Sequence, residues 1–171
     1  MNIIKENEKY VIDTLKWNGK AKKDGFKSGF IATGQVGITI TGKGIPLDGY
    51  KVDHACGAVE KVIMDEKDKE LIVIEGQGSI LHPGSTATLP LMRGSCPTHM
   101  ILCHRASATS LRHPKNILFP DLKKFVKLNE DLVSVCGTYK SAKVIGIALN
   151  TYHLSKEQAE KEIKKIESDT G

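Results

Sequence analysis

Four nearly continuous apolar runs constrain the fold more than any other feature of this chain. They span residues 29–33 (GFIAT), 71–75 (LIVIE), 99–104 (HMILCH) and 143–150 (KVIGIALN). Strands that are covered on both faces have such runs, whereas a strand with one solvated face alternates apolar and polar residues. The runs therefore predict strands of a parallel sheet that is covered on both faces.

Segments with helical spacing separate these runs. Apolar residues recur at intervals of three and four over 52–62 and 122–135, and a weaker pattern covers 7–18. Asp121 precedes the second helix as a predicted N-cap, and Ser155 opens the last helix with a capping box. Strands that alternate with helices predict an α/β fold, a three-layer αβα arrangement with a mostly parallel sheet, over residues 1–171 as one domain.

One long stretch, residues 76–98, is rich in Gly, Ser, Thr and Pro and is predicted to be irregular. A loop of that length inside a compact domain is usually functional.

Charge and composition disfavour two classes of partner. The net charge of +5 is modest and the positive residues are scattered, which argues against nucleic acid as a partner. No apolar stretch approaches the roughly 20 residues that a membrane span needs. The N-terminus lacks the apolar core of a secretion signal, and the four cysteines form no CxxC pair, so we expect a cytoplasmic protein with buried thiols rather than disulfides or zinc.

Hydrogen-bonding residues follow each apolar run. In open parallel sheets, ligands bind outside the carboxyl ends of the strands, so these residues are the candidate site. In chain order they are Thr33, Gly34, Gln35 and Gly37; Glu75, Gly76, Gln77, Gly78 and Ser79, with His82 beyond; His104 and Arg105; and Asn150.

The residue types suggest several roles. Glu75 could hold Mg²⁺ or act as a general base, although a capping carboxylate in a tight turn would look the same. His104 could be an acid or base, and Arg105 could pair with a carboxylate or phosphate. His82 could close over a ligand or be an exposed loop histidine. Cys103 and His104 should point to opposite faces of their strand, which makes them a poor nucleophile–base pair.

No GxxxxGK[ST] phosphate loop is present, and no GxGxxG follows a strand and opens a helix. Nucleotide binding therefore cannot be argued from a phosphate-binding motif.

Several of these segments are similar in sequence to a known protein family. Residues 30–60, 73–107 and 144–151, with the strings ATGQ, EGQGS, HP and LCHR, resemble the C-terminal domain of the D-glutamate N-acetyltransferase-like family. The resemblance covers about residues 10–170. It implies a P-loop NTPase-like fold similar to dethiobiotin synthetase, in which Glu75 matches a strand-end glutamate that serves as a magnesium-associated acid. It also implies acetylation of the amino group of D-glutamate, with acetyl-CoA as donor, in D-amino-acid catabolism.

The chain departs from the family pattern in five respects. Full-length members carry an N-terminal Rossmann-like domain and a Gly-rich, Lys-containing phosphate loop, and neither is found in this sequence. TGQVG replaces the commoner TGQTG, and the segment after Pro83 looks shortened. The sequence also stops at Gly171, before an expected final segment. We therefore expect an incomplete C-terminal domain of the family.

Three functions follow from this reading. The first is N-acyl transfer to a small acidic amino acid, in which Glu75 or His104 takes the ammonium proton and Arg105 binds substrate carboxylates. Backbone N–H groups of 34–37 and 76–79 would contact the ligand or the developing oxyanion. The second is an ATP- and Mg²⁺-dependent activity of the dethiobiotin synthetase type. The third is a non-catalytic binding or assembly subunit, as a homo-oligomer or in a complex with a full-length homologue.

Overall fold

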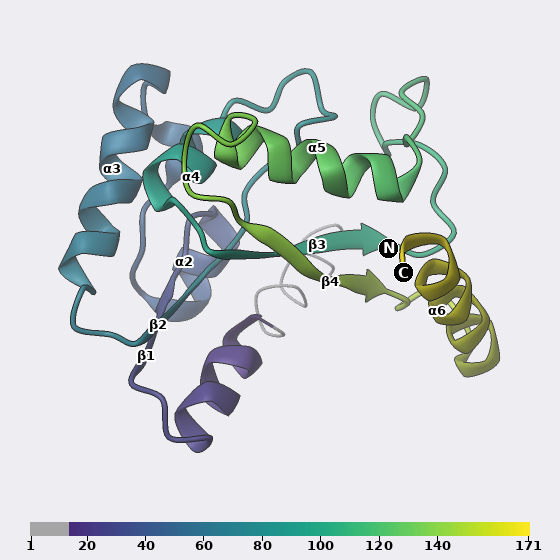
Figure 1. Cartoon of the computed structure of the whole chain (residues 1–171), viewed down its shortest axis with the longest axis horizontal. Helices are drawn as coiled ribbons and strands as arrows, with labels where there is room; N and C mark the ends of the chain where they lie inside the picture. The colour runs from purple at the N-terminus through teal and green to yellow at the C-terminus, as the bar shows by residue number, and fades with distance from the viewer. Residues whose placement is uncertain (1–13) are drawn as a thin grey trace. The chain divides into compact units, whose positions relative to one another are not determined.

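A computed structural model describes residues 14–171 of the chain (Figure 1). It contains two compact units, Met1–Ser95 and Cys96–Gly171. Each unit has its own pair of parallel strands, with helices between the strands along the chain.

The first unit alternates helices with two strands. After a helix over residues 14–23, the elements are β1 (Ser28–Ile31), α2 (Gln35–Thr41), the 3₁₀ turn η1 (Leu47–Gly49), α3 (Val52–Asp65), β2 (Leu71–Ile74) and α4 (Thr88–Ser95). Strands β1 and β2 pair in parallel, with Ser28 opposite Leu71 and Ile31 opposite Ile74. This register brings the segment after β1 beside the segment after β2.

A small apolar core holds this unit together. It comprises Ile45, Leu47, Ala55, Val59, Ala87 and Leu91, with Ile74 of β2 packed against it. Gly94 lets α4 approach α3 closely, because a Cβ on this residue would lie 2.3 Å from the carbonyl oxygen of Cys56. The core therefore fixes α4 against α3 at the far end of the long 76–98 stretch.

The second unit contains β3 (His99–Arg105), α5 (Leu122–Ser134), β4 (Lys143–Asn150) and α6 (Lys156–Thr170). The two strands pair in parallel from His99 opposite Lys143 to Arg105 opposite Asn150, with one irregularity after Met100. Both predicted caps are present. The Asp121 carboxylate accepts from the Lys124 N–H at 2.9 Å, and Ser155 and Gln158 form a complete capping box.

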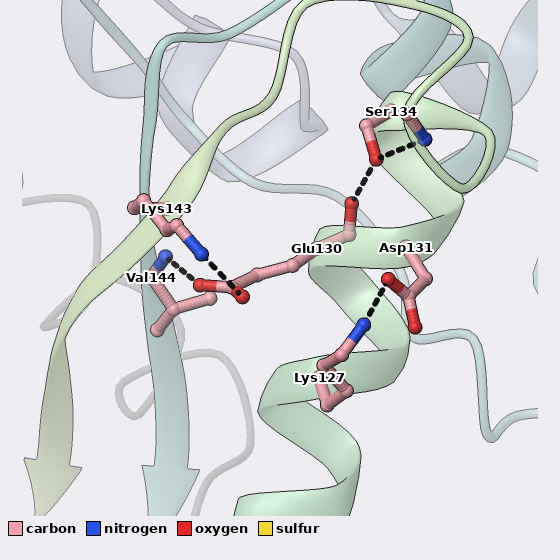
Figure 2. Close-up of polar contacts among 7 residues, drawn as sticks. Lys127, Glu130, Asp131, Ser134, Lys143 and Val144 are labelled. Atoms are coloured by element: carbon pink, nitrogen blue, oxygen red, sulfur yellow. Dashed lines mark hydrogen bonds and ion pairs between the residues drawn. The ribbon is translucent and has the colours of Figure 1, made fainter.

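A single carboxylate ties α5 to β4. Figure 2 shows Glu130 reaching from the helix to the strand, where it accepts from the Val144 N–H at 3.0 Å and from Lys143 Nζ at 3.3 Å. The Ser134 hydroxyl donates to the Glu130 carbonyl oxygen at 2.8 Å near the end of the helix. The bond to the Val144 N–H is the main reason that the pKa of Glu130 lies below its ordinary value.

The predicted α/β class and all four predicted strands are confirmed. The prediction for 7–18 is only partly testable, because residues 7–13 lie outside the described residues, but the helix continues to residue 23. None of the helices within residues 14–171 is both long and apolar enough to span a bilayer.

The prediction that 76–98 is irregular is wrong at its end, where α4 forms. Pro90 does not interrupt α4, because it lies in the first turn, where a backbone N–H has no partner within the helix anyway. The short helix α2 also went unpredicted, because its β-branched residues resemble a strand.

The prediction that both faces of the strands are covered is wrong for β3 and β4. Burial alternates along β3, with Ile101 exposed and Leu102 half-buried, and Ile145 of β4 is 63% exposed. Cys96, Cys103 and Cys136 are exposed as well, so the prediction of buried thiols fails for them. An apolar run shows that a strand avoids polar residues, but it does not identify the element that covers each face.

Replacing Glu130 tests the link between α5 and β4. Its lowered pKa means that its contribution to stability is present above pH 4.5 and is lost as the pH falls through the lowered value. We expect E130Q to lose less unfolding free energy than the unchanged protein as the pH is lowered. E130A should also cost about 1–3 kcal/mol at neutral pH, because the Val144 N–H loses its acceptor.

Chemical denaturation across the acid range checks this expectation. E160Q, which changes an exposed carboxylate on α6, is the matched control. Equal acid sensitivity of E130Q and the unchanged protein would contradict the assignment.

Candidate active site

Glu75 lies at the centre of the strand-end residues of the first unit. Its N–H donates to the Ile31 carbonyl oxygen at 2.9 Å, which extends the β1–β2 pairing by one step. Its Oε2 accepts from the backbone N–H groups of Thr33 at 2.9 Å and Gly34 at 3.0 Å. The Thr33 hydroxyl in turn donates to the Glu75 carbonyl oxygen at 2.9 Å. The carboxylate is thus held in one orientation and is only 9% exposed.

Two glycines make room for these side chains. A Cβ on Gly37 would lie 2.2 Å from Glu75 Oε2, and a Cβ on Gly34 would lie 2.6 Å from Gln77 Oε1. Any larger residue at either position would push the carboxylate or the amide away. The close approach of side chains to backbone therefore explains the Gly-Gln-X-Gly pattern after β1.

The environment of Glu75 acts on its proton affinity in two directions. Burial raises the pKa of the carboxyl, because the charged form loses hydration. The hydrogen bonds from Gly34 and Thr33 lower it, but burial is the larger cause and the pKa lies above the ordinary value of 4.5. A carboxyl with a raised pKa is suited to accept and release protons closer to neutral pH.

Gln77 is held by a residue that sequence reasoning missed. Its Nε2 donates to the Asp48 Oδ2 in η1 through a short hydrogen bond. Asp48 lies in the sequence PLDG, which does not directly follow one of the four apolar runs. The amide of Gln77 is therefore oriented by Asp48 and packed against Gly34, so it is fixed before any ligand arrives.

The rest of the 76–98 segment is organised by hydroxyl groups. Ser85 Oγ accepts from the Ser79 N–H at 3.2 Å, and the Thr88 hydroxyl donates to the Gln77 carbonyl oxygen at 3.3 Å. Gly78 has a φ of 72°, and a Cβ there would lie 2.1 Å from Ser85 Oγ, so glycine is required. These bonds attach the EGQGS turn to the start of α4.

Three predicted residues of this unit are not drawn into the Glu75 cluster. Gln35 and Gly76 are exposed. His82 is exposed too, and its Nδ1 accepts from the Gly84 N–H at 3.1 Å within its own turn. This contact agrees with the exposed loop histidine that was one of its two predicted roles.

In the second unit, His104 is half-buried at the end of β3. Its ring meets that of Phe119 edge-on, with centroids 5.4 Å apart and an interplanar angle of 65°. Burial lowers the pKa of the imidazole, and the charge of Glu162 on α6 raises it in opposition. Neither Phe119 nor Glu162 was predicted, because neither directly follows one of the four apolar runs from which the candidate site residues were taken.

Arg105 and Asn150 lie opposite each other in the parallel register of β3 and β4. Asn150 is buried, and its Oδ1 accepts from the Tyr152 N–H at 3.0 Å. Its carbonyl oxygen accepts from the Ala106 N–H at 3.1 Å. Asn150 therefore stabilises the turns that follow β3 and β4. This structural role is separate from the role in ligand binding that was predicted for it.

The predicted site thus forms two sets, one in each unit. Thr33, Gly34, Gly37, Glu75 and Gln77 lie together in the first unit. His104, Arg105 and Asn150 lie at the ends of the paired strands in the second.

Glu75 alone does not make a protein-built metal site. Among residues 14–171 no three His, Cys, Asp or Glu side chains are grouped to hold an ion. Magnesium is commonly bound through one or two carboxylates together with substrate oxygens and water, so Glu75 could supply one ligand at most.

The chain is similar to known proteins over most of its length. A family model described as "Domain of unknown function (DUF1611_C) P-loop domain" matches residues 12–171. A D-glutamate N-acetyltransferase of Tritonibacter scottomollicae is 36% identical over 158 residues, which is 92% of this chain and 47% of that protein. A D-glutamate N-acetyltransferase of a Pseudoalteromonas species is 33% identical over 143 residues, covering 83% of this chain and 42% of that protein.

A solved structure is similar as well. The crystal structure of a DUF1611 family protein from Anabaena variabilis superposes with a TM-score of 0.91 at 43% identity, over 95% of this chain and 48% of that one. The chain spans about half the length of the curated relatives that it matches.

Substitution of Gly37 tests the packing around Glu75. G37A should destabilise the fold by about 1–3 kcal/mol, because its Cβ would overlap Glu75 Oε2. The matched control is G57A in α3, where a Cβ meets nothing within 4 Å and alanine should instead stabilise the helix by about 0.5–1 kcal/mol. Urea denaturation of both variants measures the difference, and equal effects of the two would contradict the close contact.

The Glu75 carboxyl should also leave a pH signature in stability. Because its folded-state pKa is raised, its contribution to stability is complete below pH 4.5 and is lost as the pH rises through the raised value. E75Q keeps a side-chain oxygen for Thr33 and Gly34 but cannot ionise. As the pH rises above 4.5, the unchanged protein should lose unfolding free energy that E75Q keeps, and denaturation at several pH values measures this difference.

E75A is the companion variant. It removes the acceptor of two buried N–H groups and should cost about 1–3 kcal/mol below pH 4.5, where the contribution of Glu75 to stability is complete. A constant difference between E75Q and the unchanged protein across the pH range would contradict the raised pKa.

Proposed function

Because the chain belongs to the DUF1611_C P-loop domain family, we propose that it takes part in N-acetyl transfer to the amino group of D-glutamate or a similar small acidic amino acid. The names of the two curated relatives support this activity, since they match 92% and 83% of this chain. The proposal concerns the protein that contains these residues, because the match covers about half of each relative.

The observation that carries the chemistry is the buried, preoriented Glu75 with its raised pKa. We assign it the role of general base. One oxygen, Oε2, is occupied by the N–H groups of Thr33 and Gly34, while Oε1 accepts no hydrogen bond from the described residues. Oε1 would take a proton from the substrate ammonium, which frees the nitrogen lone pair for attack.

The remaining steps follow from acyl-transfer chemistry. The amine nitrogen forms a bond to the thioester carbonyl carbon of acetyl-CoA, and a tetrahedral oxyanion develops. The carbon–sulfur bond then breaks, and the departing thiolate takes the second proton from nitrogen. The products are the N-acetyl amino acid, the CoA thiol and the proton held by Glu75.

The backbone donors proposed for the oxyanion are fewer than the sequence suggested. The Gly34 N–H donates to Glu75, and the Ser79 N–H donates to Ser85. Gly76 and Gly78 are the better candidates, because residues 14–171 supply no acceptor for their N–H groups.

For the second unit taken by itself, we propose that Arg105 can pair with a carboxylate group and that His104, whose pKa is lowered by burial, can serve as a neutral hydrogen-bonding group or a base. Acetyl-CoA as donor, the place in D-amino-acid catabolism, a cytoplasmic location and an oligomeric state are parts of this proposal that stay predictions.

A second function has its own supporting observation. The hydrogen bonds of Glu75 to Thr33 and Gly34, and that of Gln77 to Asp48, are internal contacts of the kind that fix a fold. They suit a non-catalytic binding or assembly subunit equally well. The ATP- and Mg²⁺-dependent alternative stays a prediction, since no described cluster of side chains supports it.

Acetyl transfer by the purified chain tests the proposal. The chain is incubated with acetyl-CoA and D-glutamate, and the N-acetyl product and released thiol are both quantified, with L-glutamate as a parallel substrate. We expect equal amounts of the two products and a loss of about 10²-fold or more in E75Q.

A cooperative thermal transition is the control that E75Q is folded. The same assay on H104Q tests whether His104, in the second unit, is needed for activity. Full activity of E75Q would remove the general-base assignment. A folded chain that produces no N-acetyl amino acid would favour the binding subunit.

A further inference from the structure

The turn that follows β3 is attached to a helix far along the chain. The Ser107 N–H donates to Oε2 of Glu162 on α6 at 3.1 Å. Ser107 has a φ of 55°, a left-handed conformation that is uncommon for a residue other than glycine. The hydrogen bond to Glu162 helps to hold the backbone in this conformation, three residues beyond His104.

The same turn is held from the β4 side. The Ala106 N–H donates to the Asn150 carbonyl oxygen at 3.1 Å, and the Ala106 carbonyl oxygen lies 3.1 Å from Nε2 of His153. Ala106 is 1% exposed. The residues after His104 are therefore fixed from two directions, by β4 and its following turn and by α6.

Helix α6 is itself fixed within the second unit. Its N-terminus is closed by the Ser155–Gln158 capping box, and Ile166 is buried. Figure 1 shows α6 beyond the carboxyl ends of β3 and β4, the ends at which His104 and Asn150 lie. Glu162 is thus placed toward the strand ends by a rigid element.

We propose that Glu162 is a positioning residue for His104, whose carboxylate fixes the turn after β3 and places a negative charge near the imidazole. This function has two separable parts. The hydrogen bond to Ser107 needs only an oxygen acceptor at position 162, whereas the effect on the imidazole needs the charge.

The groups around His104 show why the charge matters. The Phe119 ring packs against the imidazole, and burial lowers its pKa. Arg105 is its neighbour on β3, and His153 lies in the turn after β4, against Ala106. Glu162 on α6 is the charged group that raises the pKa of His104 against the effect of burial. Without that charge, a larger fraction of the imidazole would be neutral at a given pH.

The position of Glu162 follows from the contacts within the second unit, and only its relevance to catalysis rests on the proposed function. NMR titration of the His104 ring in the full chain tests the effect of Glu162 on His104 without an activity measurement. E162Q keeps an acceptor for the Ser107 N–H but loses the charge, so the pKa of His104 should fall while the Ser107 amide resonance changes little. E162A should shift both.

The matched control is E157Q on the same helix. Glu157 pairs with Lys161 at 3.0 Å and is 79% exposed. E157Q should leave the titration of His104 unchanged. If E162Q does not fold, E162D moves the charge back by one methylene group, and the His104 pKa should then fall as well.

An unchanged His104 titration in the folded E162Q or E162D protein would overturn the proposal. The acetyl-transfer assay gives an independent answer. A lowered His104 pKa together with an unchanged pH dependence of kcat/KM would keep Glu162 as the positioning residue and remove His104 from the reaction.

Discussion

The hydrogen bonds between the Glu75 carboxylate and the N–H groups of Thr33 and Gly34 are the interaction on which the rest of the first unit's site depends. They join the segments that follow β1 and β2, which the parallel register has already brought side by side. They also impose glycine at positions 34 and 37, because the carboxylate and Gln77 occupy the space of a side chain there. The buried carboxylate thereby restricts the sequence of the segment that follows β1.

The arrangement balances stability against reactivity. Burial of the carboxylate costs hydration energy, and two backbone hydrogen bonds recover part of that cost. The balance leaves the pKa raised, a property that a purely structural carboxylate does not need. In the second unit, burial and charge have opposite effects on the pKa of His104: burial lowers it, and the charge of Glu162 raises it.

Sequence alone predicted much of this site because strand ends in parallel sheets are constrained by geometry. The four runs and the residues after them could be placed from their apolar character alone. Asp48 and Glu162 could not, because their partners lie 29 and 55 residues away along the chain and local patterns do not report such contacts. The exposure of Ile145 was missed for a related reason, since an apolar run does not reveal its covering element.

We propose that Glu75 is a proton-transfer group whose pKa is raised by burial. A titration of its carboxyl carbon by ¹³C NMR in the folded chain, assigned by comparison with E75Q, measures this directly. We expect a midpoint above 4.5, the ordinary value for the group. A midpoint at or below 4.5 would show that the two N–H groups dominate, and Glu75 would then be a structural anchor rather than a base.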